Sequence, residues 1–133
     1  MTSKDYVKIF KESGELLEGH FVLTSGRHSP SYFQCAKVLQ NSKYLKLFSD
    51  QIADHFNNSQ IDTIVSPAVG GIVIGTAVGI SMNKPAIFAE REKGRMTFRR
   101  GFSIEKGESI LIIEDVVTTG GSVKEVIQLV ESF

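Results

Sequence analysis

The spacing of apolar residues predicts two helices in the first half of the chain. In residues 4–13 the apolar positions fall on one side of a helix, and Thr2 and Asp5 fit a capping box at its start. From residue 42 to residue 56, four apolar positions recur at intervals of three and four, with Ser42 placed to cap the helix. We therefore expect a short amphipathic helix followed by a longer one.

Between these two helices the pattern predicts an antiparallel hairpin. Residues 20–23 and 31–35 are short runs of strand-forming residues. They flank residues 25–30, Ser-Gly-Arg-His-Ser-Pro, which are almost all turn-forming. Such a pair of runs around a turn is typical of a β-hairpin.

The second half of the chain alternates between strand and helix patterns. We predict strands at residues 63–66, 86–89 and 109–114 and helices at about residues 71–81 and 122–130. This alternation indicates an α/β fold with a mostly parallel sheet and flanking helices. A chain of 133 residues fits a single domain.

One predicted strand is apolar throughout. Residues 110–113 are Ile-Leu-Ile-Ile, as expected of a strand that is covered on both faces, and we place it in the middle of the sheet. The chain ends soon after the last predicted helix, without another strand. One side of the sheet is therefore expected to be exposed unless a partner covers it.

Composition excludes several functional classes. Fifteen basic residues balance fifteen acidic ones, which argues against general attraction to nucleic acid or to membranes. A single cysteine, Cys35, and three scattered histidines predict neither an internal disulfide nor a metal site. The N-terminus lacks a signal-peptide pattern, and no apolar run is long enough to cross a membrane. We expect a cytoplasmic protein.

The chemistry-bearing motif is a strand that ends in two acids and runs into a small-residue loop. Glu114 and Asp115 are followed by seven residues that complete the motif: Val116, Val117, Thr118, Thr119, Gly120, Gly121 and Ser122. Backbone amides, hydroxyls and the dipole of the next helix favour a phosphate there. Carboxylates at the strand end suit ribose hydroxyls and a metal-bound water network. A plain turn capped by serine is the alternative for Gly-Gly-Ser alone, but the full order of residues argues against it.

Two further segments fit an anionic ligand. Residues 66–71, Ser-Pro-Ala-Val-Gly-Gly, lie between a predicted strand and helix, where they add backbone amides at the same sheet edge or form only a structural corner. Residues 90–100 contain five cations and two acids, a local charge of +3. We predict a mobile loop that closes over a charged ligand. A solvated loop and RNA binding are the alternative interpretations of the same cations.

These motifs resemble those of a known enzyme family. Residues 110–122 closely resemble the phosphoribosyl-pyrophosphate signature of type I phosphoribosyltransferases. Four other stretches look like orotate phosphoribosyltransferases, so that the resemblance covers essentially the whole chain: residues 16–21, 24–35, 65–71 and 87–92. The resemblance implies the type I phosphoribosyltransferase fold, with a small N-terminal hood of about residues 1–40 that contains the hairpin. A donor-binding core of about residues 41–133 follows.

The same resemblance implies an activity and its partners. Ribose 5-phosphate would pass from 5-phospho-α-D-ribose 1-diphosphate to orotate, giving orotidine 5′-monophosphate and diphosphate in the de novo synthesis of UMP. Mg²⁺ would accompany the diphosphate. Because the mobile loop of this family commonly reaches the neighbouring subunit, a homodimer is implied. Neither nucleic acid nor a membrane is an expected partner.

The resemblance also implies roles for individual residues. The catalytic set that it implies consists of Glu114, Asp115, Arg91 and Lys93, and the donor site consists of residues 114–122. In the hood, Thr24, Ser25, Tyr32 and Phe33 match family positions. The residues expected to contact orotate are Thr118, Tyr32, Phe33 and Ser25. Both aromatic residues could equally form the core of the hood.

One departure from the family leaves two other functions open. Family members continue past the last helix into further strands and an arginine that receives the orotate carboxylate, and no residue here matches that arginine. The sequence is therefore expected to be C-terminally truncated. The alternatives to an active enzyme are an inactive remnant and a regulatory relative that binds RNA.

Overall fold

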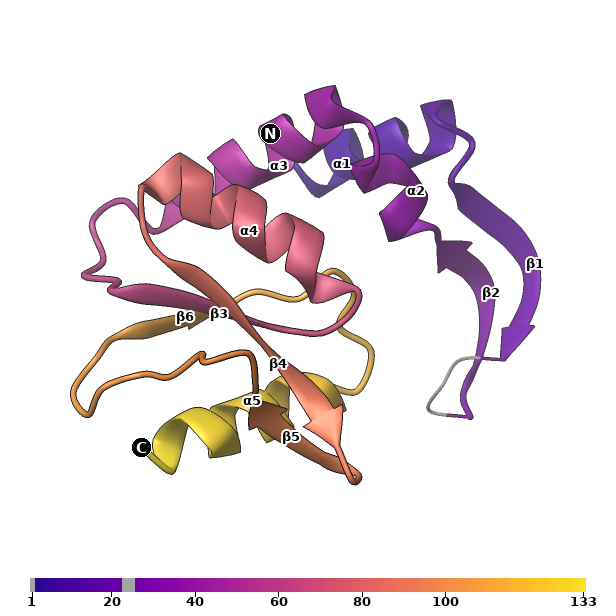
Figure 1. The fold of residues 1–133 in the computed structure, drawn as a ribbon. Helices are drawn as coiled ribbons and strands as arrows, with labels where there is room; N and C mark the ends of the chain where they lie inside the picture. Colours follow the sequence, from indigo (N-terminus) through magenta and orange to yellow (C-terminus); the bar gives the residue numbers. More distant parts are fainter. Residues whose placement is uncertain (1, 23–25) are drawn as a thin grey trace.

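The computed structural model describes residues 2–22 and 26–133, with Tyr32 and Phe33 described by their backbone alone. The elements follow one another along the chain (Figure 1) as α1 (Ser3–Glu12), β1 (Leu16–Val22), β2 (His28–Phe33), α2 (Cys35–Leu39), α3 (Ser42–His55), β3 (Thr63–Pro67), α4 (Gly71–Met82), β4 (Ala86–Glu92), β5 (Arg95–Phe98), β6 (Ile110–Ile112) and α5 (Gly121–Glu131).

A four-stranded sheet with the order β5-β4-β3-β6 forms the centre of the fold. β3 pairs in parallel with both β4 and β6, and β5 is antiparallel to β4. Helices α3 and α4 lie on one face of this sheet and α5 lies on the other (Figure 1). The predicted α/β fold with a mostly parallel sheet and flanking helices is confirmed.

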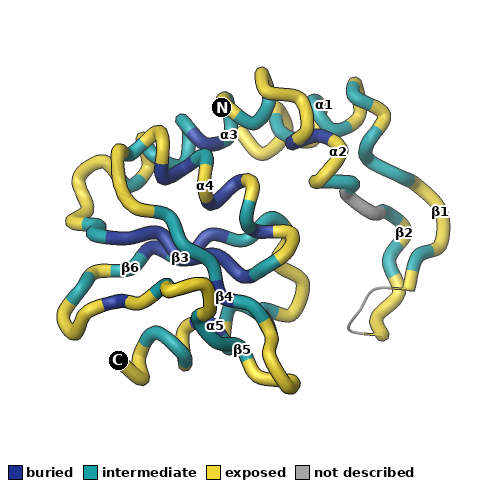
Figure 2. The backbone as a smooth tube through the Cα atoms, in the orientation of Figure 1, coloured by how far each residue is buried: buried dark blue, intermediate teal, exposed yellow. Residues whose placement is uncertain are grey.

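The core consists of two layers, one on each face of the sheet. Six buried residues fill the layer under α3 and α4: Leu39, Ile64, Ile74, Val78, Leu111 and Ile113. Three buried residues fill the layer under α5: Val65, Ala89 and Val126. β3 contributes to both layers because successive residues of a strand point to opposite faces, and Figure 2 shows this strand buried along its length.

The prediction that residues 110–113 form the middle strand is wrong for the described chain. β6 lies at the edge of the sheet, and β3 is the strand with neighbours on both sides. The apolar run has another cause: Leu111 and Ile113 belong to the layer under α4, whereas Ile110 and Ile112 pack toward α5. Burial of both faces of this strand is enough to account for the apolar run, without a central position in the sheet.

All four predicted helices are present, but the predicted cap at Ser42 is wrong. The capping box of α1 forms as predicted, with the Thr2 backbone N–H donating to Asp5 Oδ2 at 2.6 Å. α3 is capped instead by Asn41, whose side-chain oxygen accepts from a backbone N–H. α5 begins after Gly120, which has a φ of 80°, and Ser122 lies inside the helix. None of the described helices combines the length and apolarity needed to cross a membrane.

The N-terminal hairpin is confirmed with shifted boundaries. β1 and β2 pair antiparallel, with Glu18 opposite Ser31, and β1 begins four residues before the predicted strand. Residues 23–25 of the predicted hairpin lie outside the described part of the chain. Cys35, predicted to end the second strand, instead begins the short helix α2, which the apolar pattern did not reveal.

The charged segment at residues 90–100, predicted to be a loop, is mostly a second hairpin. β4 continues to Glu92, and β5 returns from Arg95. Lys93 and Gly94, with φ angles of 52° and 77°, form the two-residue turn, and positive φ at both positions suits the twist of a hairpin. The charges hide the strand pattern, in which alternate residues pack against the layer under α5.

Substitution of Gly75 tests whether α4 needs a residue without a side chain to pack closely on the sheet. A Cβ atom at this position would overlap the hydroxyl of Ser66, which is buried in β3. Gly→Ala within a helix normally stabilises by about 1 kcal/mol. Here we predict that Gly75→Ala instead lowers the free energy of unfolding by about 1 to 3 kcal/mol, because the helix must move away. Urea denaturation measures this change.

The matched test is the double variant with Ser66→Gly, which removes the group that the new methyl meets. We expect the Gly75→Ala cost to be smaller in that background than in the wild type. Equal costs in both backgrounds would show that the Ser66 contact does not set the position of α4.

Candidate active site at the carboxyl ends of the parallel strands

Two loops meet where the parallel strands end. The loop after β3 runs through residues 68–70, and the loop after β6 runs through residues 113–120. They touch at glycines, because a Cβ at Gly70 would lie 2.7 Å from Asp115 Oδ2, and one at Gly71 would lie 3.2 Å from a Glu114 carboxylate oxygen. The structure thus brings together the two segments in which the sequence predicted anion-binding loops.

The two adjacent carboxylates differ in environment. Both Glu114 and Asp115 are half-buried, and the Asp115 backbone N–H donates to Glu114 Oε1 at 2.9 Å. Burial, followed by the neighbouring Asp115 side chain, raises the pKa of Glu114 from 4.5 to about 7. Glu114 therefore holds its proton to a higher pH than an ordinary carboxyl while no ligand or cation neutralises the pair.

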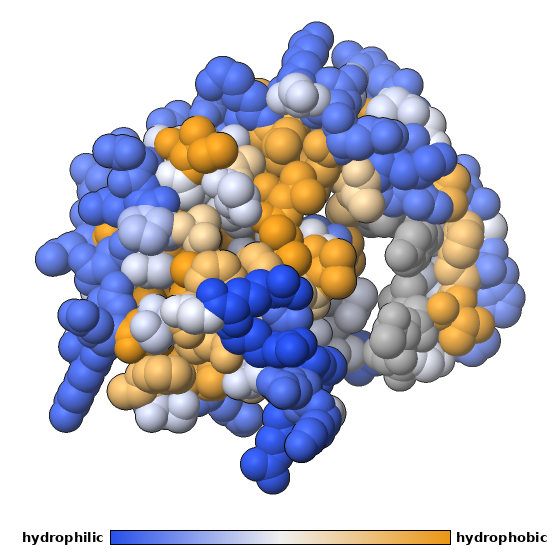
Figure 3. All heavy atoms as spheres, viewed as in Figure 1, coloured by the Kyte–Doolittle hydropathy of each residue, from blue (hydrophilic) through white to orange (hydrophobic). Residues whose placement is uncertain are grey.

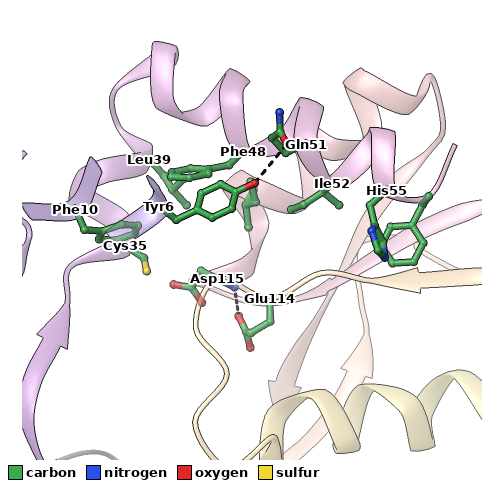
Figure 4. Close-up of a pocket in the computed structure, with 12 residues that line it drawn as sticks. Tyr6, Phe10, Cys35, Leu39, Phe48, Gln51, Ile52, His55, Glu114 and Asp115 are labelled. Carbon is green, nitrogen blue, oxygen red and sulfur yellow. Dashed lines mark hydrogen bonds between the residues drawn. The ribbon is translucent and has the colours of Figure 1, made fainter. Parts of the chain in front are cut away.

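A cavity of about 570 Å³ opens above these carboxylates. Glu114 and Asp115 form its polar side, and mainly apolar residues of the helices form the opposite side (Figure 4). The remaining lining residues are Tyr6, Phe10, Cys35, Leu39, Phe48, Gln51, Ile52, His55, Phe56 and Ile74. None of these was predicted to belong to the site. For the apolar residues among them, the only sequence signal was the apolar face of a helix, which is equally expected of core residues.

The chemistry of the carboxylate pair suits a hard cation. Within the described chain, no three His, Cys, Asp or Glu side chains lie together as a metal cluster. Burial and the nearby Asp115 raise the pKa of Cys35 to about 11, so the free thiol is protonated at neutral pH. The donors that remain are carboxylate oxygens, and Gly70 leaves Asp115 without a side chain packed over it. Oxygen donors of this kind fit Mg²⁺, which usually keeps several waters.

The predicted phosphate loop lies open to solvent. Residues 116–119 are exposed, and Val117 retains 63% of its accessible surface. Gly120, in the left-handed conformation, turns the chain into α5, and Ser122 lies in the first turn of that helix. Backbone amides and the hydroxyls of Thr118 and Thr119 are therefore accessible next to a helix N-terminus, which favours an anion.

The two predicted basic residues lie on the second hairpin. Arg91, on β4, donates to both carboxylate oxygens of Glu125 at 2.5 and 2.9 Å. Glu125 lies on α5 just after the phosphate loop, so this pair fastens the hairpin to that helix. Lys93 lies in the turn between β4 and β5. Nothing in the sequence singled out Glu125, because its partner is 34 residues away.

The predicted orotate contacts are only partly described. Thr24 and Ser25 lie outside the described residues. Tyr32 and Phe33 belong to β2, and their side chains are not part of the description. Thr118 lies in the exposed part of the loop before α5.

The raised pKa of Glu114 predicts a dependence of stability on pH. A carboxyl that ionises at a higher pH when folded loses stability as the pH rises from about 4.5 through about 7. Glu114→Gln removes this ionisation, so we expect the variant to be more stable than the wild type above pH 7. The gain should be about 1 to 2 kcal/mol, reduced from the full shift because the side chain is half-exposed.

Urea unfolding of the variant at about pH 5 and about pH 8 measures this difference. Glu131→Gln, at the exposed end of α5, is the control with the same change in charge. If both variants respond to pH as the wild type does, the Glu114 environment does not differ between the folded and unfolded states.

Comparison with known proteins agrees with this geometry. Residues 36–133 match the phosphoribosyl transferase domain family. An orotate phosphoribosyltransferase from Chlorobium phaeobacteroides is 56% identical over 132 residues, which are 99% of this chain and 68% of that enzyme.

Solved structures agree as well. The structure of Leishmania donovani UMP synthase matches with a TM-score of 0.80 and 26% identity, over 96% of this chain and 28% of that one. Orotate phosphoribosyltransferase from Aeropyrum pernix, at 23% identity, shares the fold with a TM-score of 0.73, over 94% of this chain and 72% of that one. On the strength of the sequence identity across its length, the chain belongs to the orotate phosphoribosyltransferase family.

Proposed function

We propose that this chain transfers ribose 5-phosphate from 5-phospho-α-D-ribose 1-diphosphate to orotate, which yields orotidine 5′-monophosphate and diphosphate for the synthesis of UMP. The observation that carries the proposal is the pair Glu114 and Asp115, placed between an accessible anion loop and a cavity in a chain of this family. A sugar phosphate fits this arrangement because its hydroxyls and its phosphate are separated by the length of the ring.

In the proposed reaction a ring nitrogen of orotate bonds to C1 of the ribose as the bond from C1 to diphosphate breaks, and the proton of that nitrogen passes to water or to the diphosphate. The sugar carries positive charge in the transition state. Glu114 and Asp115 hold the ribose hydroxyls, and their negative charge stabilises the cationic ring. Both carboxylates also fix the orientation of C1. No covalent intermediate with the protein is required.

The loop at residues 116–122 would bind the 5-phosphate of the donor. Its exposed amides and hydroxyls approach the start of α5, where the helix dipole stabilises an anion. Residues 68–71 add amides beside Asp115 for the diphosphate. Arg91 and Lys93 neutralise the departing diphosphate, and Arg91 must first leave Glu125 or share its guanidinium with the ligand.

Asp115, with help from Glu114, would hold Mg²⁺ through oxygen ligands and bound water. When bound, this cation would neutralise charge on the diphosphate. The protein's own contribution is to present the carboxylates uncovered at the cavity edge, since Gly70 places no side chain there. A cation would also favour the ionised form of Glu114.

The acceptor site would lie between the core and the N-terminal hairpin. We assign orotate contacts to Thr118, Ser25, Tyr32 and Phe33, and we assign the hood to about residues 1–40 and the donor-binding core to about residues 41–133. Flat aromatic faces can stack on a pyrimidine. The proposed cytoplasmic location follows from the same metabolic role.

RNA binding is less well supported than catalysis. Arg91, Arg99 and Arg100 are three of the five cations at residues 90–100, and each is paired with a glutamate of the same chain. The strongly hydrophilic side chains over β4 and β5 in Figure 3 therefore include arginines whose charge is already balanced. A nucleic acid would have to break these pairs.

A homodimer is supported by the outer face of α4. Val73 and Ile80 on α4 retain 50% and 77% of their accessible surface, and Val69, just before the helix, retains 81%. Apolar residues gather over this helix in Figure 3. Helices that are apolar all round are normally buried. A second copy would cover this stripe, and the hairpin of β4 and β5 would reach the neighbouring site.

The activity is tested by following the loss of orotate with the donor and Mg²⁺ present. We predict that Asp115→Asn, which keeps the shape but removes the charge, lowers turnover by at least about tenfold, because one preorganised electrostatic contact commonly contributes more than that. Asp54→Asn, on the exposed side of α3, is the control and should match the wild type. Near-normal turnover of Asp115→Asn would refute the role of this carboxylate.

Calorimetric titration of the same variants separates the enzyme from an inactive remnant. An active enzyme binds the donor and consumes orotate. A remnant binds the donor without consuming orotate, which would overturn the proposed reaction and leave the binding site in place. Failure to bind either the donor or the nucleotide product would overturn both.

The dimer is tested by light scattering after size-exclusion chromatography. We predict that the wild type has the mass of two chains and that Ile80→Glu has the mass of one, because a charge cannot be buried unpaired in an apolar interface. Val22→Glu, on exposed β1, should remain dimeric. A dimeric Ile80→Glu variant would show that this part of α4 lies outside the interface.

A further inference from the structure

Two histidines meet on the exposed side of the N-terminal hairpin. Nε2 of His20, on β1, contacts Nδ1 of His28, on β2, and the two ring centroids are 4.7 Å apart. Both residues are exposed. The two ring nitrogens therefore face each other at a place that solvent ions can reach.

A bulge in β1 produces this arrangement. Glu18 pairs with Ser31 and Phe21 pairs with Ser29, so two residues on β1 stand opposite a single residue on β2. The extra residue is accommodated at Gly19, whose φ of 151° is unfavourable for residues with a side chain. Bulges redirect side chains and often accompany functional positions. Here the bulge brings His20 over its partner across the strands.

We propose that His20 and His28 bind one divalent transition-metal ion, such as Zn²⁺ or Ni²⁺. Neutral imidazole is a common ligand of these ions. Two nitrogens bound to one tetrahedral zinc ion are about 3.3 Å apart, given bonds of about 2.0 to 2.1 Å. Binding would replace the direct contact between the two nitrogens, and both exposed side chains would rotate until each lone pair points at the ion.

The donor set distinguishes this site from the carboxylate pair. Nitrogen ligands select borderline metals, whereas carboxylates and water suit Mg²⁺. In the described residues no third His, Cys, Asp or Glu joins the pair as a three-ligand cluster, so water completes the coordination. A bound ion would link β1 to β2 and stabilise the hairpin in proportion to its occupancy.

The site is tested by calorimetric titration of the full chain with zinc chloride. We expect one ion per chain. His20→Gln and His28→Gln should each weaken binding by at least about tenfold, since loss of even an outer-shell partner weakens metal sites by 10- to 100-fold. His55→Gln, on α3 and away from the hairpin, is the matched control and should bind as the wild type does.

Hydrogen exchange of the β1 and β2 amides gives a second measurement. Zinc should slow exchange in the wild type and in His55→Gln but not in the two hairpin variants. The proposal is overturned if the wild type binds no zinc, or if both hairpin variants bind it as the wild type does. In the latter case the two rings form only a hydrogen bond, and zinc binds elsewhere. Neither result bears on the proposed transferase activity.

Discussion

The close approach of α4 to the sheet is the contact on which the rest of the structure depends. Gly71, Gly75 and Gly79 recur every four residues and therefore face the sheet together. A Cβ at these positions would press on Ile113, Ser66 and Ala86 respectively. Without side chains there, the helix lies against β3 and its neighbours. This close packing of α4 brings the loop after β3 into contact with Glu114 and Asp115.

Much of the fold follows from periodic patterns. α1 and α3 were predictable because their apolar positions repeat with one period over enough residues. The hairpin of β4 and β5 was not, because charged residues occupy its outward positions. The cap at Asn41 was missed because adjacent Asn and Ser are both good caps, and local sequence does not decide between them.

The candidate site likewise has one part that the sequence predicted and one part that it did not. Its carboxylates and predicted phosphate loop are contiguous in sequence, so composition and order were enough to single them out as one candidate site. The apolar wall of the cavity comes from separate helices, and its residues look like core residues until the chain is folded. Contacts such as Arg91 with Glu125 and His20 with His28 depend on strand register and helix docking. A one-residue bulge is enough to create the second of these.

The pair of Arg91 and Glu125 joins the tip of β4 to the helix that starts at the phosphate loop. An anion that restrains the start of that helix would therefore also restrain the tip of the hairpin. Restraint of the tip would in turn restrain the loop. Such coupling is reciprocal by thermodynamic necessity.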